Sequence, residues 1–199
     1  AFVTRTAADR VGGQSIHHFA PSGDDSPWRQ SYAYTDERGT PHQHETTLAR
    51  HALLYTTVAG HKLAFLGLHL KSDPSDARAN ARRGAEAQIA QRIIQTQILE
   101  RGYQPVVLGD LNDYDPEVPD RDPLRSSQTE VLRTLKDYDA KRKGNELVNV
   151  ARHIQRPEDR MTSHWDRNEN GAADSEDVYT MIDHILLPEA LEKHLRRTF

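Results

Sequence analysis

The chain has 199 residues and a formal net charge of −4 at pH 7, a length that suits one domain with its own hydrophobic core. It contains no cysteine, which excludes disulfides, zinc–thiolate sites and thiol nucleophiles. The acidic net charge argues against a general polyanion-binding protein. No stretch approaches the roughly 20 apolar residues that a membrane span requires, so we expect no membrane span.

The first 46 residues are polar and rich in Gly, Pro, His and Asp, which predicts loops with one short strand near residues 31–35. Residues 48–58 and 62–70 then predict two antiparallel strands joined by a tight turn. The second of these strands is apolar on both faces, which predicts a central strand covered on both sides.

A long helix is predicted over residues 75–101, with Ser75 as the N-cap and Gly102 as the stop signal. Residues 104–108 follow as a buried strand. The remaining elements are predicted as a helix over 128–136, a short strand over 147–150, a strand over 179–187 and a short helix from Pro188. No internal repeat or long linker divides the chain, so we predict a single mixed α and β domain over residues 1–199.

Asp110 and Asn112 leave the buried strand together in the sequence Gly-Asp-Leu-Asn. Because side chains alternate along a strand, both should project to the same side. A carboxylate can bind a cation or orient a water molecule, and an amide can donate to a phosphoryl oxygen without adding negative charge. The alternative is that the pair merely forms a turn, as Asp and Asn commonly do.

His69 ends the preceding strand and could donate a hydrogen bond to a phosphate or carry a proton, although a single histidine at a strand end is more often structural. Asp183 lies within an otherwise apolar strand, where an ionised carboxylate is costly unless it meets a partner or a metal. His184 should point to the opposite face, which makes it the weaker candidate.

Taken together, the segments around His69, Asp110 and Asp183 resemble, in their order and spacing, the motifs of the endonuclease/exonuclease/phosphatase superfamily. This superfamily includes pancreatic-type deoxyribonucleases, inositol polyphosphate phosphatases and bacterial sphingomyelinases. The resemblance runs from about Thr47 to Leu187. It implies an α+β fold of the deoxyribonuclease I type, in which a two-sheet β-sandwich is flanked by helices and the site lies at one end of the sandwich.

The resemblance also implies roles for individual residues. His69 would contact the scissile phosphate, Asp110 would orient or deprotonate the attacking water, and Asn112 would bind a phosphate oxygen. Asp183 would support the site or stabilise the leaving group. Mg²⁺, or alternatively Mn²⁺, would be held by Asp110 and Asn112, since hard cations prefer oxygen ligands. The expected substrate-binding residues are Arg50, Arg82 and Ser163.

The implied activity is hydrolysis of a phosphodiester by water, without a covalent intermediate, and the favoured substrate is a nucleic acid. The same chemistry permits a phosphomonoesterase or a lipid headgroup phosphodiesterase. The family's N-terminal strand with a metal-associated Asn, its Glu-bearing strand and its C-terminal Ser-Asp-His are not recognisable between Ala1 and Phe199. We therefore expect a portion of a longer polypeptide, incomplete at both ends, with a catalytically inactive, calcium-stabilised binding module as the alternative.

Residues 166–177 form a second motif, which places oxygen-bearing side chains at positions 1, 3, 5, 9 and 12 of a 12-residue stretch and Gly171 at position 6, as an EF-hand Ca²⁺ loop does. Asp177 is shorter than the usual Glu at position 12 and a strand follows, so we predict a structural loop rather than a sensor; a polar turn is the alternative. The predicted ligands are Asp166, Asn168, Asn170, the carbonyl of Ala172, Asp174 and Asp177. A calcium loop favours a secreted or periplasmic protein.

Overall fold

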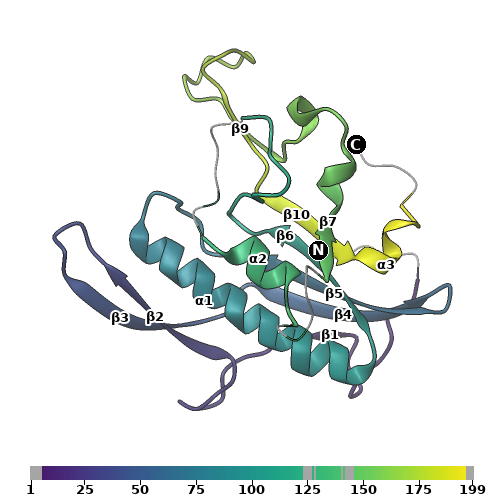
Figure 1. The fold of residues 1–199 in the computed structure, drawn as a ribbon. Helices are drawn as coiled ribbons and strands as arrows, with labels where there is room; N and C mark the ends of the chain where they lie inside the picture. Colours follow the sequence, from purple (N-terminus) through teal and green to yellow (C-terminus); the bar gives the residue numbers. More distant parts are fainter. Residues whose placement is uncertain (1–5, 123–126, 128, 140, 142–145, 196–199) are drawn as a thin grey trace.

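The computed structural model describes residues 6–122, 127, 129–139, 141 and 146–195. Its strands form one six-stranded sheet and two separate two-stranded sheets (Figure 1). In spatial order, the strands of the large sheet are β1 (Ile16–His17), β4 (His51–Val58), β5 (His61–His69), β6 (Gln104–Asp110), β10 (Asp183–Pro188) and β7 (Leu147–Asn149). The small sheets are β2 (Arg29–Thr35) with β3 (Pro41–Thr47), and β8 (Ser163–Trp165) with β9 (Val178–Thr180). The predicted mixed α+β class is confirmed.

The hairpin of β4 and β5 matches its prediction. The strands pair antiparallel from His51 opposite Leu68 to Val58 opposite His61. The two residues between the strands, Ala59 and Gly60, both have positive φ angles of 49° and 83°, as a type I′ hairpin turn requires.

The core lies between the large sheet and two helices, α1 (Ala77–Ile93) and α2 (Val131–Lys136), which lie on the same face of the sheet in Figure 1. On β5, Ala64, Leu66 and Leu68 are buried in this core, whereas the alternate residues Leu63 and Phe65 are only partly buried. The strand is therefore central, as predicted, but its second face is less covered than its sequence suggests.

The long helix is less regular than predicted. It begins one residue later, because Asp76 rather than Ser75 is the N-cap and accepts a 2.7 Å hydrogen bond from the backbone N–H of Arg78. After Ile93 it continues as a π-helical turn over Ile94–Ile98 and a 3₁₀ turn over Leu99–Arg101. Gly102 then ends it in the left-handed conformation, as predicted.

The short strand predicted near residues 31–35 is seen as β2, but the prediction that the rest of residues 1–46 are loops is wrong for β3, which pairs with β2 in a complete antiparallel hairpin. Its strands alternate His, Gln, Glu, Thr and Tyr, so neither face shows the apolar pattern that identifies a half-buried strand. Arg92 of α1 fixes the hairpin by donating to the carbonyls of Pro27 and Arg29 and to the side chain of Gln30.

The single strand predicted over residues 179–187 is two strands. β9 pairs with β8, whereas β10 pairs with β6 and β7, so the chain changes sheets at Met181 and Ile182. The predicted helix over 128–136 is seen as α2, and Gln128 lies outside the described residues. The helix expected from Pro188 is the short α3 (Glu189–Glu192). Among the described residues, no helix combines the length and hydropathy that crossing a bilayer demands.

Candidate functional site

Strand register brings three of the predicted residues to one end of the large sheet. Asp110 is the last residue of β6 and is paired with His69, the last residue of the parallel strand β5. On its other side Asp110 is paired with Asp183, the first residue of the antiparallel strand β10. The distance from His69 Nε2 to Asp110 Oδ2 is 3.7 Å. His69, Asp110, Asp183 and Asn112 are called the sheet-end cluster below.

Gly109 permits the close approach of β5 and β6 beside this cluster. Its φ angle is 123°, and a Cβ atom at this position would lie 2.1 Å from the carbonyl oxygen of Leu68, far inside van der Waals contact. Just beyond, the backbone N–H of Leu70 donates to the carbonyl of Asp110 at 2.9 Å. The glycine of the Gly-Asp-Leu-Asn motif is therefore required by the backbone of the neighbouring strand.

Asn112 forms a turn, as the alternative interpretation predicted, and it also lies beside Asp110. It has a φ angle of 51°, a left-handed conformation that Asn tolerates better than most residues. Its backbone N–H donates to Asp110 Oδ1 at 3.0 Å, and its side-chain amide donates to the carbonyl of Leu70 at 3.1 Å. Asn112 thus fixes the orientation of the Asp110 carboxylate.

Asp183 is placed differently from its prediction. It is not enclosed within an apolar strand; it is exposed at the start of β10, so its charge carries no large desolvation cost. Partial burial raises the pKa of Asp110, and the nearby carboxylate of Asp183 adds to this rise, while the backbone N–H of Asn112 and the ring of His69 oppose it. Two carboxylates that repel each other in this way favour a cation between them.

Of the predicted substrate-binding residues, Arg50 lies beside the cluster and Arg82 does not contact it directly. Arg50 Nη1 is 2.9 Å from His69 Nε2, and both side chains are exposed. Arg82 forms an ion pair with Glu86 at 2.9 Å. The other Glu86 oxygen accepts from the backbone N–H of Lys71, so this pair joins α1 to the chain that leaves β5.

The third predicted substrate-binding residue, Ser163, lies half-buried in β8 opposite Thr180. Its neighbour Thr162 contacts the segment that leads into β10. Thr162 Oγ1 accepts hydrogen bonds from the backbone N–H groups of Ile182 at 3.1 Å and Asp183 at 3.0 Å. Thr162 therefore positions the start of β10. No local pattern identifies it, because its partners lie about 20 residues further along the chain.

A buried polar network supports the cluster from the opposite face of β10. Burial lowers the pKa of His184, whose Nδ1 accepts from the Asn149 side chain at 2.9 Å and whose Nε2 donates to the carbonyl of Asp113 at 2.9 Å. Asn149 also donates to Asp115 at 3.1 Å, and Asp115 forms a buried ion pair with Lys136 at 2.8 Å. The chain that follows Asp110 is thus fixed to β10, β7 and α2.

The sheet-end cluster fits a divalent cation that takes few ligands from protein. Over the described parts of the chain, no three His, Asp or Glu residues are grouped closely enough to hold a metal ion by themselves. Asp110 and Asp183 supply two carboxylates and Asn112 an amide. Mg²⁺ suits such a set, because it is commonly bound through one or two carboxylates, with waters and substrate phosphates completing its octahedron.

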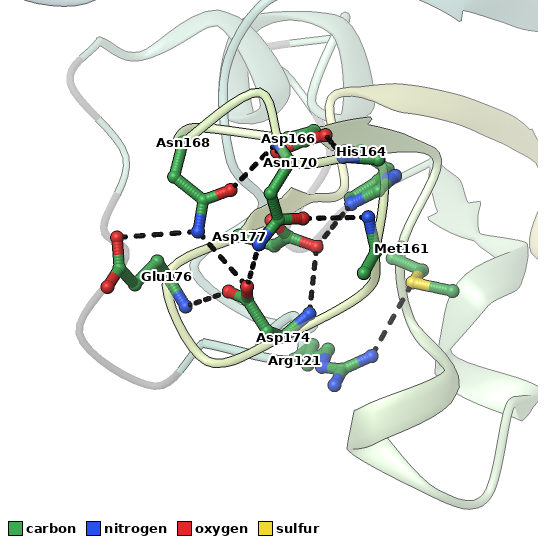
Figure 2. Close-up of polar contacts among 11 residues, drawn as sticks. Arg121, Met161, His164, Asp166, Asn168, Asn170, Asp174, Glu176 and Asp177 are labelled. Carbon is green, nitrogen blue, oxygen red and sulfur yellow. Dashed lines mark hydrogen bonds and ion pairs between the residues drawn. The ribbon is translucent and has the colours of Figure 1, made fainter.

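The residues of the predicted calcium loop lie together between β8 and β9 (Figure 2). They form a separate group from the sheet-end cluster. Asp166, Asn168, Asn170 and Asp174 surround Asp177, which also contacts His164 of β8.

No protein-family model matches the chain, and no curated protein gives a significant match. Solved structures with a similar fold include D. rerio TDP2 complexed with a single-strand DNA product, which is 14% identical, with a TM-score of 0.43 and coverage of 87% of this chain and 62% of that one.

The catalytic domain of human Nocturnin is 12% identical, with a TM-score of 0.41 and coverage of 81% of this chain and 46% of that one. An endonuclease/exonuclease/phosphatase family protein from Bacteroides thetaiotaomicron is 12% identical, with a TM-score of 0.40 and coverage of 81% and 50%. The chain therefore spans between 46% and 62% of the length of these structures, and the likenesses concern fold alone.

Proposed function

We propose that this chain hydrolyses phosphodiester bonds of nucleic acids, with a divalent cation, by direct attack of water. The observation that carries the proposal is the register of three adjacent strands, which places His69, Asp110 and Asp183 side by side at one sheet end. A histidine, two carboxylates and an arginine within one group are the functional groups that in-line displacement at phosphorus requires.

The residues have complementary roles in this reaction. Asp110 orients the attacking water and accepts its proton, a role that its raised pKa favours because a more basic carboxylate accepts a proton more readily. Asn112 keeps Asp110 in place through its backbone N–H. His69 and Arg50 bind the phosphoryl oxygens. Asp110, Asn112 and Asp183 would hold a divalent cation, which would supply positive charge to offset the negative charge developing on those oxygens.

The exposure of the cluster supports a polymeric substrate. The side chain of His69 is 47% exposed, and Arg50 and Asp183 are exposed as well. An open site at a sheet end accommodates a chain that continues past the scissile bond on both sides, whereas small ligands are usually enclosed on most of their surface. This observation favours a nuclease over a phosphomonoesterase or a lipid headgroup phosphodiesterase.

A calcium-stabilised binding module without catalysis is the second candidate. It is favoured by one observation: in the part of the chain that the structure describes, Asp110 and Asp183 do not form a metal-binding group of three with His69 or with any other acidic or histidine side chain. On this alternative the sheet-end cluster binds a phosphate-containing partner without cleaving it.

Asp110→Asn tests the proposal in the full-length protein. The substitution preserves shape and the oxygen that accepts from Asn112 but removes the charge. We expect cleavage of single-strand DNA, duplex DNA or RNA in Mg²⁺ or Mn²⁺, its loss on chelation with EDTA, and a decrease of about 10³-fold in the variant. Asp24→Asn, at an exposed acid in the turn before β2, is the matched control and should cleave normally.

Undiminished turnover by Asp110→Asn would remove Asp110 from the mechanism. Hydrolysis of inositol phosphates or sphingomyelin in place of nucleic acids would keep the chemistry and overturn the substrate. Binding of nucleic acid without cleavage by the wild-type chain would favour the inactive module.

A further inference from the structure

The loop over residues 166–177 joins β8 to β9 and takes no part in the proposed hydrolysis (Figure 2). Gly171 occupies the sixth position of the loop with a φ angle of 75°. This is the position at which an EF-hand loop makes its sharp turn and at which glycine is required. The backbone therefore adopts at this residue the bend that the sequence pattern predicts.

Hydrogen bonds from backbone N–H groups to side-chain oxygens hold the first half of the loop in its turn. The Asp166 carboxylate accepts from the backbone N–H groups of Asn170 at 3.3 Å and Gly171 at 2.7 Å. The side-chain oxygens of Asn168 and Asn170 accept from the backbone N–H groups of Asn170 and Ala172, respectively. These bonds turn the oxygen-bearing side chains toward the interior of the loop.

Two amide groups meet one carboxylate at the centre of the loop. The Nδ2 atoms of Asn168 and Asn170 both donate to Asp174 Oδ2, at 3.0 and 2.7 Å. The donors thus place partial positive charge between oxygen-bearing side chains, where a cation would otherwise lie. Each amide oxygen keeps a second lone pair beside its backbone hydrogen bond, so a rotation of these side chains that directs the oxygens to the centre of the loop makes them ligands and releases the Nδ2 bonds to Asp174.

Asp177 supplies an independent observation that points to a ligand in the loop. Its side chain is fully buried, and Figure 2 shows it within the ring formed by the other loop residues. One oxygen, Oδ2, accepts from His164 Nε2 at 2.8 Å and from the backbone N–H of Asp174 at 3.2 Å. The other oxygen, Oδ1, is buried without a hydrogen-bond partner. A buried, unpaired oxygen of a carboxylate is costly and calls for a partner such as an ion.

We propose that residues 166–177 bind one Ca²⁺ ion, which coordinates the Asp177 Oδ1 atom that has no hydrogen-bond partner. The ligands are the side chains of Asp166, Asn168, Asn170, Asp174 and Asp177 and the carbonyl of Ala172. Among the described residues no three carboxylates are grouped closely enough for a metal site, so binding must draw Asp166, Asp174 and Asp177 together. Six oxygen ligands with flexible geometry match Ca²⁺, whereas Mg²⁺ demands a nearly ideal small octahedron. With three carboxylates and a short Asp at the last position, we expect a dissociation constant of about 10⁻⁴–10⁻³ M, the range of extracellular calcium modules.

The ion would also order the strands that lead to the sheet-end cluster. β8 and β9 pair over only three residues each, from Ser163 opposite Thr180 to Trp165 opposite Val178. The 12-residue loop connects the two strands. Thr162, directly before β8, accepts from the backbone N–H of Asp183. Calcium binding therefore stabilises the segment that positions Asp183, without a ligand shared between the two sites.

Terbium luminescence tests the site directly, because Trp165 precedes the first ligand, Asp166, and can transfer energy to a lanthanide that replaces Ca²⁺. We expect Tb³⁺ emission on excitation of tryptophan. Ca²⁺ should displace Tb³⁺ and raise the melting temperature with a midpoint of about 10⁻⁴–10⁻³ M, and Mg²⁺ at the same concentration should not. Absence of both emission and the calcium-dependent rise in melting temperature would overturn the proposal.

Two loop variants and one matched control locate the ion. Asp177→Asn and Asn170→Ala should each weaken Ca²⁺ binding by more than about tenfold. Glu169→Gln is the matched control for Asp177→Asn, because it also removes one negative charge from the loop. Glu169 is at position 4, where the side chain is exposed and is not a ligand, so this variant should bind Ca²⁺ normally. Far-UV circular dichroism establishes that each variant is folded; if Asp177→Asn is not, Asn170→Ala on the exposed rim decides. Equal binding by Asn170→Ala and Glu169→Gln would place the ion elsewhere and overturn the assignment.

Discussion

The sheet-end cluster and the loop over residues 166–177 are both polar sites, but they are built in opposite ways. The cluster combines residues from three strands that are as much as 114 positions apart (69 to 183), and the register of buried strands holds them together. The loop is contiguous, mostly exposed, and held by hydrogen bonds among its own residues. The cluster therefore depends on the whole sheet, whereas the loop depends mainly on its own twelve residues and on the Ca²⁺ ion proposed to bind them.

This difference determines how substitutions in each region should affect the folding of the protein. A change in backbone packing at the cluster must displace neighbouring strands, and tightly packed interiors relax only partly. A similar change in the loop meets open solvent. Substitutions that disturb the backbone packing at the cluster should therefore unfold the protein, while those in the loop should leave the sheet intact.

Two glycines with positive φ angles allow this comparison to be made with the same substitution. In Gly109→Ala, the new Cβ would lie 2.1 Å from the Leu68 carbonyl, and the strands must separate. In Gly171→Ala, no atom lies within 4 Å of the new Cβ, so only the strain of a left-handed alanine is added. We expect a loss of more than about 4 kcal/mol in the free energy of unfolding for the first variant and about 1 kcal/mol for the second.

Urea denaturation of both variants measures these values. If Gly109→Ala is too unstable to purify while Gly171→Ala yields a normal transition, the order of effects is established. Equal, small losses for both would mean that β5 and β6 are not held as closely as the register indicates.

The sequence predicted His69 and Asp110 at strand ends, and the resemblance in order and spacing to a known superfamily joined Asp183 to them. It placed Asp183 in the interior of one strand rather than at the start of β10, since the apolar run over residues 179–187 hides the change of sheet at Met181 and Ile182. The sequence predicted a short strand within β2 but missed β3, because β3 lacks an apolar face. Thr162 was missed for another reason: its function lies in two backbone partners from a distant segment, and a single side chain carries no pattern.

Thr162 also provides the link between the two regions, which a second substitution can break. Thr162→Val keeps the shape of the side chain but removes the oxygen that accepts from Ile182 and Asp183. Because the site is exposed and water can replace part of the interaction, we expect a loss of about 1 kcal/mol in stability. Nuclease activity should decrease by about tenfold, as Asp183 loses its fixed position.

Thr162→Ser retains the hydroxyl and is the matched control, with stability and turnover close to wild type. Turnover and melting temperature measured in saturating Ca²⁺ separate the two contributions. If Thr162→Val and Thr162→Ser behave alike, the hydroxyl does not connect the loop to Asp183.

The two regions also shift the pKa of a carboxyl group in opposite directions. This pKa difference is the smallest of the predicted effects, and it compares the two regions directly. Burial and the Asp183 carboxylate raise the pKa of Asp110, whereas hydrogen bonds, led by the one from Asn168, lower the pKa of Asp174. The contribution of protonated Asp110 to stability is therefore lost as pH rises through its raised pKa. The contribution of ionised Asp174 is lost as pH falls through its lowered pKa.

Carboxyl ¹³C chemical shifts, followed by NMR between pH 2 and 7 (about the range in which aspartates titrate) in metal-free buffer, should show Asp110 titrating above and Asp174 below the ordinary aspartate value. Asn168→Ala should move the Asp174 midpoint back toward that value and leave the Asp110 midpoint unchanged, because the two residues lie in separate networks. Coincident midpoints in the wild-type protein would contradict both the like-charge pairing at the sheet end and the amide donors in the loop. A shift at Asp110 alone would mean that the loop exchanges rapidly among open states when no ion is bound, which would make calcium the agent that closes it.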